Sequence, residues 1–315
     1  MINDQWIRKI GLLVLSGGQA LDLSAFHIRF DVAAADVETP NNATIRVYNL
    51  SDATVLKIRG EFSQVVLNAG YENGNYGVIF QGSIKQFRIG RESNTTKYLD
   101  ILASDGDIGY NSGTVNTTLA KGTTQKDQVE VCTKAMVGDV QADFSKLFID
   151  KQHVPNLRGT VLWGMANARM RNCASTLDAS WSIQNGVVTI INKTGYDPNQ
   201  TVELNAMTGL IGLPEQTDGG LMIRCLLNSR LRVGGSVRIN NSFVNQILQQ
   251  NPDAAPVAYN SRTALQPIAP LSPDGVYRIF VIEHEGDTRG QPWYSNLICL
   301  AVDISSPADA AVSKQ

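Results

Sequence analysis

The sequence contains 315 residues and carries a formal net charge of −2; 43% of its residues are hydrophobic and 18% are charged. A chain of this length can bury more than one core, and its composition excludes the disordered and fibrous classes. The small net charge gives no reason to expect a general attraction to nucleic acid or to an anionic membrane.

The cysteines and the N-terminal segment indicate the compartment. The four cysteines are far apart and form no CxxC pair, which is typical of a reducing compartment and argues against structural disulfides or a thiolate zinc site. Residues 1–15 contain a short apolar run without a small-residue cleavage site after it, so they predict a β-strand and not a signal peptide. No stretch approaches the roughly 20 apolar residues of a membrane helix.

The first 105 residues are expected to form a compact antiparallel β-module, because short β-rich runs alternate with Gly, Asn, Asp or Pro. The runs cover residues 6–15, 26–34, 43–47, 64–71, 76–89 and 97–103. Asn73-Gly74 is a strong hairpin signal between two of these runs. Ser51 is the expected N-cap of one short helix that continues through Arg59, with Val55 and Ile58 on its inner face.

The spacing of apolar residues changes in residues 106–198, which are expected to form a small α+β domain. Residues 123–128 open a helix whose apolar residues keep helical spacing, and a second helix is predicted from about Thr160 to Leu177. Two apolar runs that flank Asn185-Gly186 predict a hairpin over residues 180–191.

Residues 199–303 return to β-structure and are expected to form a second β-module. Strands are predicted at residues 201–204, 220–227 and 236–240. A proline-rich insertion at about 243–273 interrupts them, and Phe243–Leu248 favours one helix inside it. Residues 304–315 are small and polar, which is typical of a flexible tail.

Residues 76–105 and 274–303 share one pattern. Each segment contains a long strand, a polar hairpin loop and a returning strand that begins with an aromatic residue, Tyr98 or Tyr294, and ends in Asp. The identity between them is weak, so two unrelated hairpins remain the alternative to an internal duplication. If the duplication holds, three chains would present six similar modules, and such a trimer could stack on a hexameric ring and on a trimeric partner.

Several segments of the chain resemble phage baseplate hub proteins. They are residues 42–50, 67–72, 79–82, 209–217, 234–239, 277–279 and 283–287. The first three resemble the opening barrel of those proteins, and the others resemble the entry to the second barrel, its interior and its closing strands. The resemblance covers about residues 1–303, and its motifs are structural and not catalytic.

The resemblance implies a mainly β fold with α+β: two tail-tube-like antiparallel β-barrel modules, residues 1–105 and 199–303, flank the middle domain, residues 106–198. It also implies the function of a structural hub in a phage tail baseplate. The hub would be a homotrimeric, pseudo-sixfold ring that adapts the hexameric tail tube to the trimeric central spike. The ring would surround the channel for DNA and the tape-measure protein.

The partners implied are the trimeric central spike protein, the tail-tube or tube-initiator ring, the tape-measure protein and other baseplate wedge proteins. Many hub proteins and the related type VI secretion spikes continue into a needle or carry a lysozyme domain. This sequence shows neither, so its spike is expected to be a separate polypeptide. The expected location is the virion, after assembly in the bacterial host cytoplasm, with no membrane contact and with DNA only in transit.

No catalytic, cofactor-binding or metal-binding residue is expected. His27, His153 and His284 are scattered, and no HExxH or GxSxG motif is present. Asp105-Gly106-Asp107 lacks the acidic residue that closes a calcium loop, so we interpret it as a solvated turn. Glu283 and Glu285 could serve a glycosidase. Their spacing of two on a predicted strand instead favours one charged face with His284 opposite.

Two other classes of function remain as alternatives. A tail-tip peptidoglycan hydrolase would use Glu283 and Glu285 and would show muralytic activity. A host-glycan-binding adhesion protein would show measurable affinity for glycans, although the α+β middle domain makes this class less natural.

The interface candidates lie in two long hairpin loops, Gly90–Thr96 and Gly286–Tyr294. Tube-like barrels pack partly through such loops, which is why the loops are expected to contact other subunits or the spike. The candidate contact residues are Arg91, Glu92, Arg289 and Trp293.

Overall fold

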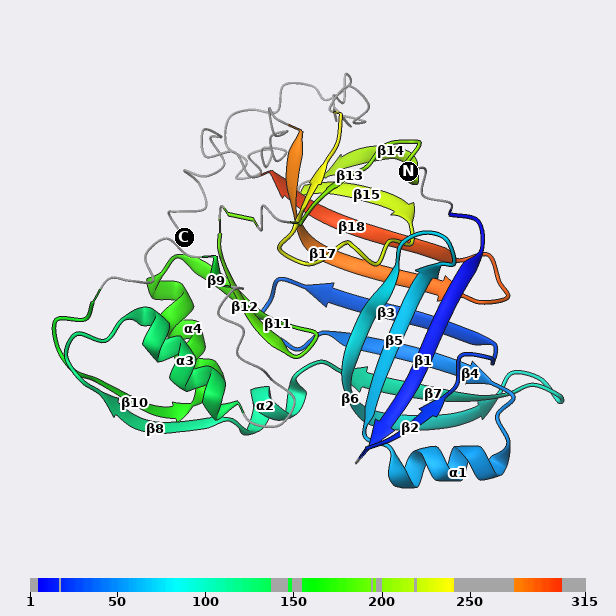
Figure 1. Ribbon diagram of the computed structural model, residues 1–315, viewed down its shortest axis with the longest axis horizontal. Helices are drawn as coiled ribbons and strands as arrows, with labels where there is room; N and C mark the ends of the chain where they lie inside the picture. Colours follow the sequence, from blue (N-terminus) through cyan, green and yellow to red (C-terminus); the bar gives the residue numbers. More distant parts are fainter. Residues whose placement is uncertain are drawn as a thin grey trace, which may run out of the picture.

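The computed structural model describes residues 5–16, 18–136, 147–148, 155–193, 195–196, 200–217, 220–240 and 275–301. These residues form a mainly β structure with four helices, α1 to α4, and the strands β1 to β18 (Figure 1). The predicted insertion at 243–273, its helix at Phe243–Leu248 and the predicted tail at 304–315 lie outside the described residues.

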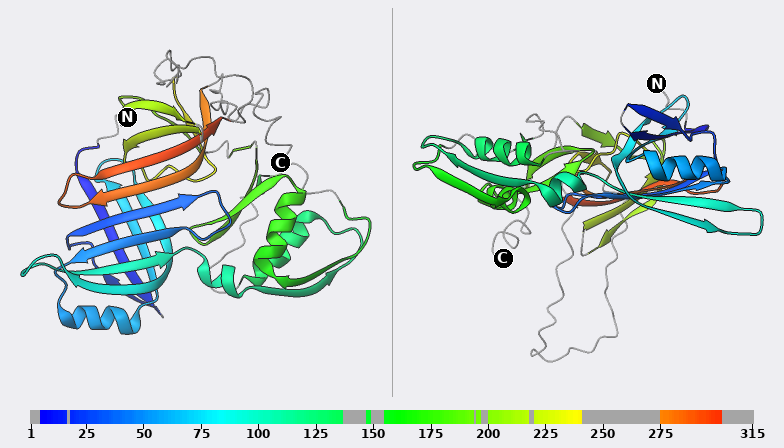
Figure 2. Two further views of the ribbon diagram at one scale, coloured as in Figure 1. Left: turned by 180° about the vertical axis from the view of Figure 1, so that it is seen from behind. Right: turned by 90° about the horizontal axis from the view of Figure 1, so that it is seen from below.

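The first third of the chain forms the elements that its pattern predicts. They are β1 (Arg8–Ser16), β2 (Gln19–Asp22), β3 (Ile28–Ala35), β4 (Asn42–Tyr48), α1 (Asp52–Glu61), β5 (Gln64–Tyr71), β6 (Tyr76–Arg91) and β7 (Lys97–Ser104). Only the short strand β2 was not predicted. β1, β5 and the first half of β6 cross over β3, β4 and β7, and the apolar core of this part lies between the two layers (Figures 1 and 2).

Helix α1 begins and packs as its sequence predicts. The Ser51 hydroxyl accepts a hydrogen bond from the Thr54 N–H, which satisfies one of the free donors of the first turn. Val55 and Ile58 are buried on the inner face of the helix, whereas Leu56 on the outer face is 68% exposed.

The middle domain is a small α+β unit at one side of the sheet (Figure 1). Its elements are α2 (Asp107–Ser112), β8 (Thr114–Leu119), α3 (Gln125–Ala135), β9 (Leu147–Phe148), β10 (Thr160–Met165), α4 (Ala166–Thr176), β11 (Ala179–Gln184) and β12 (Val187–Asn192). The predicted hairpin is β11–β12, and its turn residues Asn185 and Gly186 both have positive φ, as a two-residue hairpin turn requires.

The predicted helix over Thr160–Leu177 is wrong in its first third, because residues 160–165 form strand β10 and the helix α4 begins only at Ala166. β10 pairs with β8, and its burial alternates: Leu162 is buried while Val161 and Trp163 are exposed. Gly164 has φ +110°, which no helical residue adopts. The side chains of this segment therefore follow the two-residue period of a strand.

The described part of the last third supplies six strands. They are β13 (Thr201–Glu203), β14 (Leu210–Thr217), β15 (Gly220–Leu226), β16 (Ser236–Arg238), β17 (Val276–Asp287) and β18 (Trp293–Ala301). The runs predicted at 201–204, 220–227 and 236–240 correspond to β13, β15 and β16. Most of their buried apolar side chains form a separate core that includes Tyr277, Ile279 and Leu297, whereas Trp293 belongs to the core of the first region.

The two β-regions form one open sheet and not two closed barrels. The order β14-β15-β18-β17-β3-β4-β7-β6-β5-β1-β2 runs through both regions, with β16 beside β17 and β13 beside β16. The prediction of two barrel modules is therefore not confirmed: over the described strands the sheet has free ends at β14 and β2. The physical reason is that β3 pairs with β17 of the other region instead of closing on a strand of its own region.

The two regions nevertheless share one connectivity. The order β3-β4-β7-β6-β5 in the first region matches β14-β15-β18-β17-β16 in the second, and every neighbouring pair in both sets is antiparallel. The match ends there, because β1 pairs antiparallel with β5 whereas β13 pairs parallel with β16.

Two details strengthen this correspondence. The β6–β7 ladder has a bulge between Ile84 and Gln86, and the β17–β18 ladder has one between Ile279 and Val281, at the same distance from its loop. In addition, the Arg46 guanidinium lies 3.8 Å from the ring centroid of Tyr98, and Arg224 lies 4.3 Å from that of Tyr294. Both pairs join the same two corresponding strands, which two unrelated hairpins would not be expected to share.

Candidate functional site

The junction between the two β-regions is the first feature that bears on assembly. β3 pairs antiparallel with the C-terminal half of β17, with Arg29 opposite Asp287 and Ala35 opposite Val281. The Trp293 side chain is 1% exposed, and its ring meets that of Phe30 edge-on at 5.5 Å. A large aromatic contact and a seven-residue ladder thus fasten one region to the other.

The hairpin loop between β17 and β18 is held by the first region. Arg8 of β1 donates hydrogen bonds to the carbonyls of Asp287, Gly290 and Gln291 at 3.0, 2.6 and 2.9 Å. The Arg8 guanidinium also lies 5.4 Å from the centroid of the Trp293 ring. The loop at 286–294 is therefore an intramolecular connection.

The carboxylate of Asp287 organises this loop. Its Oδ1 accepts hydrogen bonds from the Arg289 and Gly290 N–H groups, each at 2.8 Å, and lies 2.7 Å from His27 Nε2. Burial raises the pKa of Asp287, but these hydrogen bonds outweigh burial and hold the pKa below its usual value. The carboxylate is thus stabilised in its charged form.

No side chain of the other β-region, among the residues that the structure describes, holds the corresponding loop between β6 and β7. Residues 91–95 are exposed, and the Glu92 N–H donates to the Thr96 carbonyl within the same turn. The β6–β7 hairpin projects beyond the body of the sheet (Figure 2). Of the interface candidates, Arg91, Glu92 and Arg289 are exposed, whereas Trp293 makes its contacts inside the chain.

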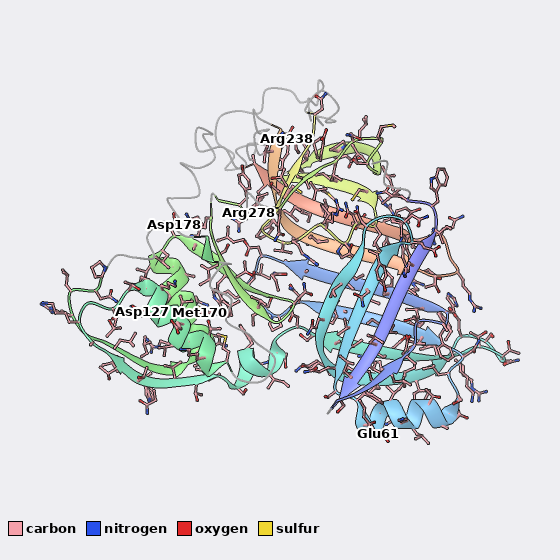
Figure 3. The ribbon with its side chains drawn as sticks, viewed as in Figure 1. Glu61, Asp127, Met170, Asp178, Arg238 and Arg278 are labelled. Atoms are coloured by element: carbon pink, nitrogen blue, oxygen red, sulfur yellow. The ribbon has the colours of Figure 1, made fainter. Side chains whose placement is uncertain are left out.

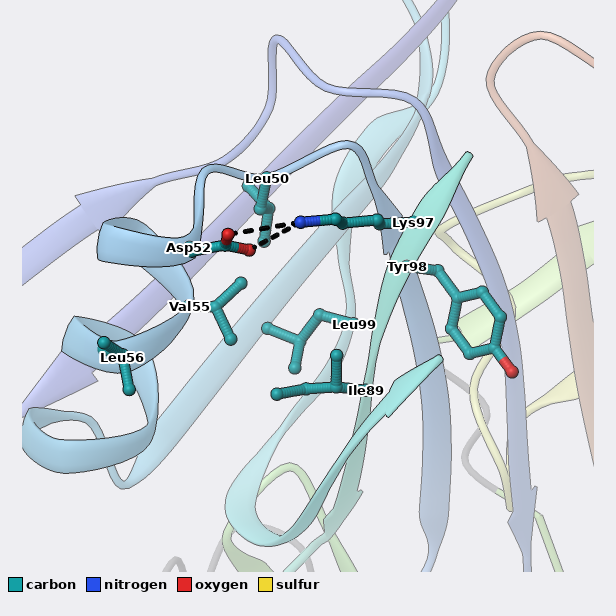
Figure 4. A pocket seen from close by; sticks show the side chains of 8 residues that line it. All are labelled: Leu50, Asp52, Val55, Leu56, Ile89, Lys97, Tyr98 and Leu99. Atoms are coloured by element: carbon teal, nitrogen blue, oxygen red, sulfur yellow. Dashed lines mark hydrogen bonds and ion pairs between the residues drawn. The ribbon is translucent and has the colours of Figure 1, made fainter. Parts of the chain in front are cut away.

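An open apolar hollow of about 210 Å³ lies next to this free hairpin, between α1, β6 and β7 (Figure 4). It is lined by Leu50, Asp52, Val55, Leu56, Ile89, Lys97, Tyr98 and Leu99. Ile89, near the end of β6, is 55% exposed at this hollow, and Leu56 of α1 is 68% exposed. Sequence patterning did not indicate this hollow, because α1 and β6 meet only in the folded chain.

A buried ion pair joins the two β-regions where they contact the middle domain. The guanidinium of Arg278 in β17 (labelled in Figure 3) pairs with the Asp36 carboxylate. The two side chains are 3% and 1% exposed. Arg278 also donates to the carbonyls of Asn192 and Lys193 at 2.8 and 3.0 Å. No pattern in the sequence pointed to this pair, because its members are 242 residues apart.

The residues considered for chemistry have structural roles. The Asp105 carboxylate is buried and accepts the Asn185 and Gly186 N–H groups, so it holds the β11–β12 turn and is not a solvated turn residue. Glu285 and the exposed Glu283 lie on the face of β17 opposite buried His284, as predicted, and Glu285 pairs with Arg224 at 2.7 Å. Burial lowers the pKa of His284 to about 3.

The part of the chain described here contains no cluster of three or more metal-ligating side chains. All four cysteines are free thiols in buried positions. None of the described helices combines the length and the apolar character that a membrane span requires.

Solved structures of tail proteins share this fold. The tail protein from Neisseria meningitidis MC58 superposes with a TM-score of 0.57 at 10% identity, over 93% of this chain and 96% of that one. The 43 kDa tail protein of prophage MuSo2 from Shewanella oneidensis gives 0.56 at 6% identity, over 94% and 97%. Among curated proteins no match was found.

A third structure extends the comparison to secretion. The E. coli c3393 protein, a component of the type VI secretion system with structural similarity to the T4 bacteriophage tail proteins gp27 and gp5, gives a TM-score of 0.50 at 12% identity. The match covers 89% of this chain and 74% of that one. The overall fold of this chain is therefore similar to that of these tail proteins and of a type VI secretion component.

The sequence places the chain within this class. The family model of the baseplate hub gp41 matches residues 8–251, which is most of the chain. The chain belongs to the baseplate hub gp41 family, a family of structural proteins of the virion tail.

Proposed function

We propose that this chain is a structural hub of a contractile phage tail baseplate that forms a homotrimeric ring. The observation that carries the proposal is the repeated connectivity of five strands in each β-region, within one continuous sheet. Each chain then supplies two similar regions, and three chains supply six in pseudo-sixfold arrangement. The repeat makes the two regions of one chain structurally alike without making them identical.

The ring would adapt partners of different symmetry. Six similar regions can face a hexameric tail tube or tube-initiator ring, while the true threefold axis faces a trimeric central spike. The structural similarity to a type VI secretion component, itself described as similar to gp27 and gp5, supports a place next to a spike. Wedge proteins of the baseplate would bind the outside of the ring.

The centre of the ring would be the channel for DNA and the tape-measure protein. The net charge of −2 supports transit of DNA without strong binding. We propose that the protein has no enzymatic role, that it assembles in the cytoplasm of the bacterial host, and that Arg91, Glu92 and Arg289 contact neighbouring subunits or the spike.

The test is the solution mass of the full chain by light scattering, alone and with the spike protein of the same virion. Three chains of 34.2 kDa, about 103 kDa together, are expected alone or in the complex. A monomer in both conditions overturns the proposed ring. A zymogram measures the alternative, a tail-tip hydrolase: clearing that disappears in the Glu283→Gln or Glu285→Gln variant would replace the structural role with an enzymatic one.

A further inference from the structure

Among the described strands, the outer edges of β2, β13 and β14 carry no ladder, and neither does one edge of β6 over its second half. β6 pairs with β7 along residues 83–91 on one edge, but its other edge is paired only at residues 76–83, by β5. At the opposite end of the sheet, β14 pairs with β15 and with no other strand among the described residues. Unpaired edges with exposed backbone groups are sites where another strand can add.

The chain already contains the contact that the free edge of β6 lacks. β17 corresponds to β6, and on the equivalent edge it carries two strands: β16 along residues 276–278 and β3 along residues 281–287. β3 in turn corresponds to β14, since each is joined by a hairpin to the strand that follows it. The strand that would cover β6 by analogy is therefore β14, and β14 of the same chain lies at the other end of the sheet.

Burial at corresponding positions supports this analogy. His284 of β17 is covered by β3 and is 4% exposed, whereas Ile89 at the corresponding position of β6 is 55% exposed. Ala34 of β3 lines the hollow beside His284 together with Leu231 and Ile282. The hollow beside Ile89 has no strand in the place of β3. Ile89 is thus an apolar side chain that is exposed at a position where the internal repeat predicts a neighbouring strand.

We infer that β14 of one copy of this chain adds to the free edge of β6 of a second copy, in the register of the β3–β17 ladder. This inference rests on the proposed ring and specifies the strands that close it. Arg46 of β4 and Arg224 of β15 correspond, because each lies over the equivalent tyrosine ring. Arg29 of β3 lies opposite Arg46, and Ile211 of β14 lies opposite Arg224, so Arg29 corresponds to Ile211. When β14 pairs with β6 in the register in which β3 pairs with β17, Glu215 lies opposite Gly90 and Thr217 lies opposite Arg88 of the second copy.

The side chains on the two edges complement each other. Glu215 is exposed, and Arg88 of the second copy would lie diagonally across the ladder from it on the same face, within reach of an ion pair. Among the described residues of its own chain, Arg88 hydrogen-bonds to the side chain of Gln86 alone, at 3.1 Å. The free half of β6 also carries the exposed Arg91, whereas Lys85 on the same half is paired with Asp107 within the chain. Arg88 and Arg91 would therefore meet an acidic residue.

The bulge in β14 offers an occupant for the hollow. Ile211 and Glu215 of β14 correspond to Arg29 and Asp31 of β3. Between them β14 has the three residues 212–214, whereas β3 has only Phe30. Leu213 in this bulge is 59% exposed, and Leu56 at the hollow is 68% exposed. As Phe30 packs on Trp293 within the chain, Leu213 would pack into the hollow beside Ile89 of the next copy.

The pairing is head to tail, since it joins two different edges, and repeated pairing produces a ring if the rotation between copies closes. Each copy would then have one β3–β17 junction inside it and would share a β14–β6 junction with each of its two neighbours. The β6–β7 loop would contact the neighbour at the position where the β17–β18 loop contacts β1 and β3.

The test is disulfide trapping in the full chain, alone and with the spike protein. The variant Thr217→Cys with Arg88→Cys is expected to form intermolecular disulfides under mild oxidation. The Cα atoms of opposite residues in an antiparallel ladder lie about 4.5–5.5 Å apart, which is within the range that a disulfide spans. The matched control, Thr217→Cys with Gln81→Cys, puts the second thiol on the half of β6 that β5 covers and should not crosslink. The wild-type thiols are buried and provide the background.

Charge reversal gives an independent readout if the cysteine variants fold poorly. Glu215→Arg or Arg88→Glu alone should weaken self-association at least several-fold, and the two substitutions together should restore it. A ring that persists in light scattering without crosslinking and without any effect of charge reversal would overturn the pairing while leaving the proposed hub function in place. A monomer in every condition would overturn both.

Discussion

Loss of one partner of the buried Arg278–Asp36 pair should destabilise the protein more than any surface substitution. In the folded chain the pair is surrounded by the Ser180 hydroxyl, which donates to Asp36 at 2.6 Å, and by the carbonyls of Asn192 and Lys193. Burial lowers the pKa of Arg278, although the adjacent Asp36 carboxylate opposes this effect. The pair therefore holds two charges in a site with almost no water.

Arg278→Met keeps most of the side-chain volume and removes the charge, which leaves the Asp36 carboxylate buried without a cation. The expected cost is ~3–5 kcal/mol in the free energy of unfolding. In the double variant Arg278→Met with Asp36→Leu no charge remains uncompensated. Two carbonyls still lose their donors, at about 1 kcal/mol each, so the double variant should be more stable than Arg278→Met alone.

The assay is urea denaturation followed by tryptophan fluorescence, since Trp181 lies in the middle domain and Trp293 in the sheet. Lys97→Met is the matched control: it removes a cation from an exposed pair with Asp52 and should cost less than ~1 kcal/mol. A cost below ~1 kcal/mol for Arg278→Met, or equal costs for the single and double variants, would refute the reasoning.

Three further predictions concern the junction and its surroundings. Trp293→Ala should cost ~3–5 kcal/mol by cavity formation, whereas the 67%-exposed Trp163 can be replaced by Ala for less than ~0.5 kcal/mol; thermal denaturation that ranks them equally would contradict the packing. The pKa of His284 is about 3 in the folded chain and 6.5 when exposed. The unfolded chain therefore binds more protons between these values, and stability should fall on acidification through this window by up to ~1.4 kcal/mol per pH unit. His284→Gln should flatten that slope in denaturation curves measured from pH 7 to 4, and an unchanged slope would argue against a neutral buried imidazole. Arg8→Ala should lower the urea midpoint because it frees the 286–294 loop, whereas Arg91→Ala should leave the midpoint unchanged and weaken only self-association, and the reverse pattern would exchange the roles of the two loops.

Much of the local structure follows from the sequence alone. The side-chain oxygen of Ser51 caps α1 whatever surrounds it, and Asn185-Gly186 readily adopts the positive φ values of a tight hairpin turn. The resemblance of structural motifs to baseplate hub proteins also indicated the family before any fold was known. These features depend on neighbouring residues, which sequence reasoning can follow.

The boundary of α4 shows where local patterning stops being sufficient. The apolar residues of 160–165 also fit helical spacing, so the period did not decide between helix and strand. Pairing with β8 over residues 114–119 decides it, because the backbone groups of β10 find their partners in a strand that is remote in sequence.

Only the tertiary structure decided which strand edges are paired and which are free. Nothing in the sequence shows that β3 leaves its own region to pair with β17, or that Trp293 consequently becomes buried while the corresponding loop at 90–96 stays exposed. The same is true of Asp36 and Arg278, whose burial depends on the contact between the middle domain and the sheet. Sequence patterns specify which residues can form a strand, but the pairing of strands depends on long-range packing and backbone hydrogen bonds, and that pairing distinguishes an internal junction from a free edge.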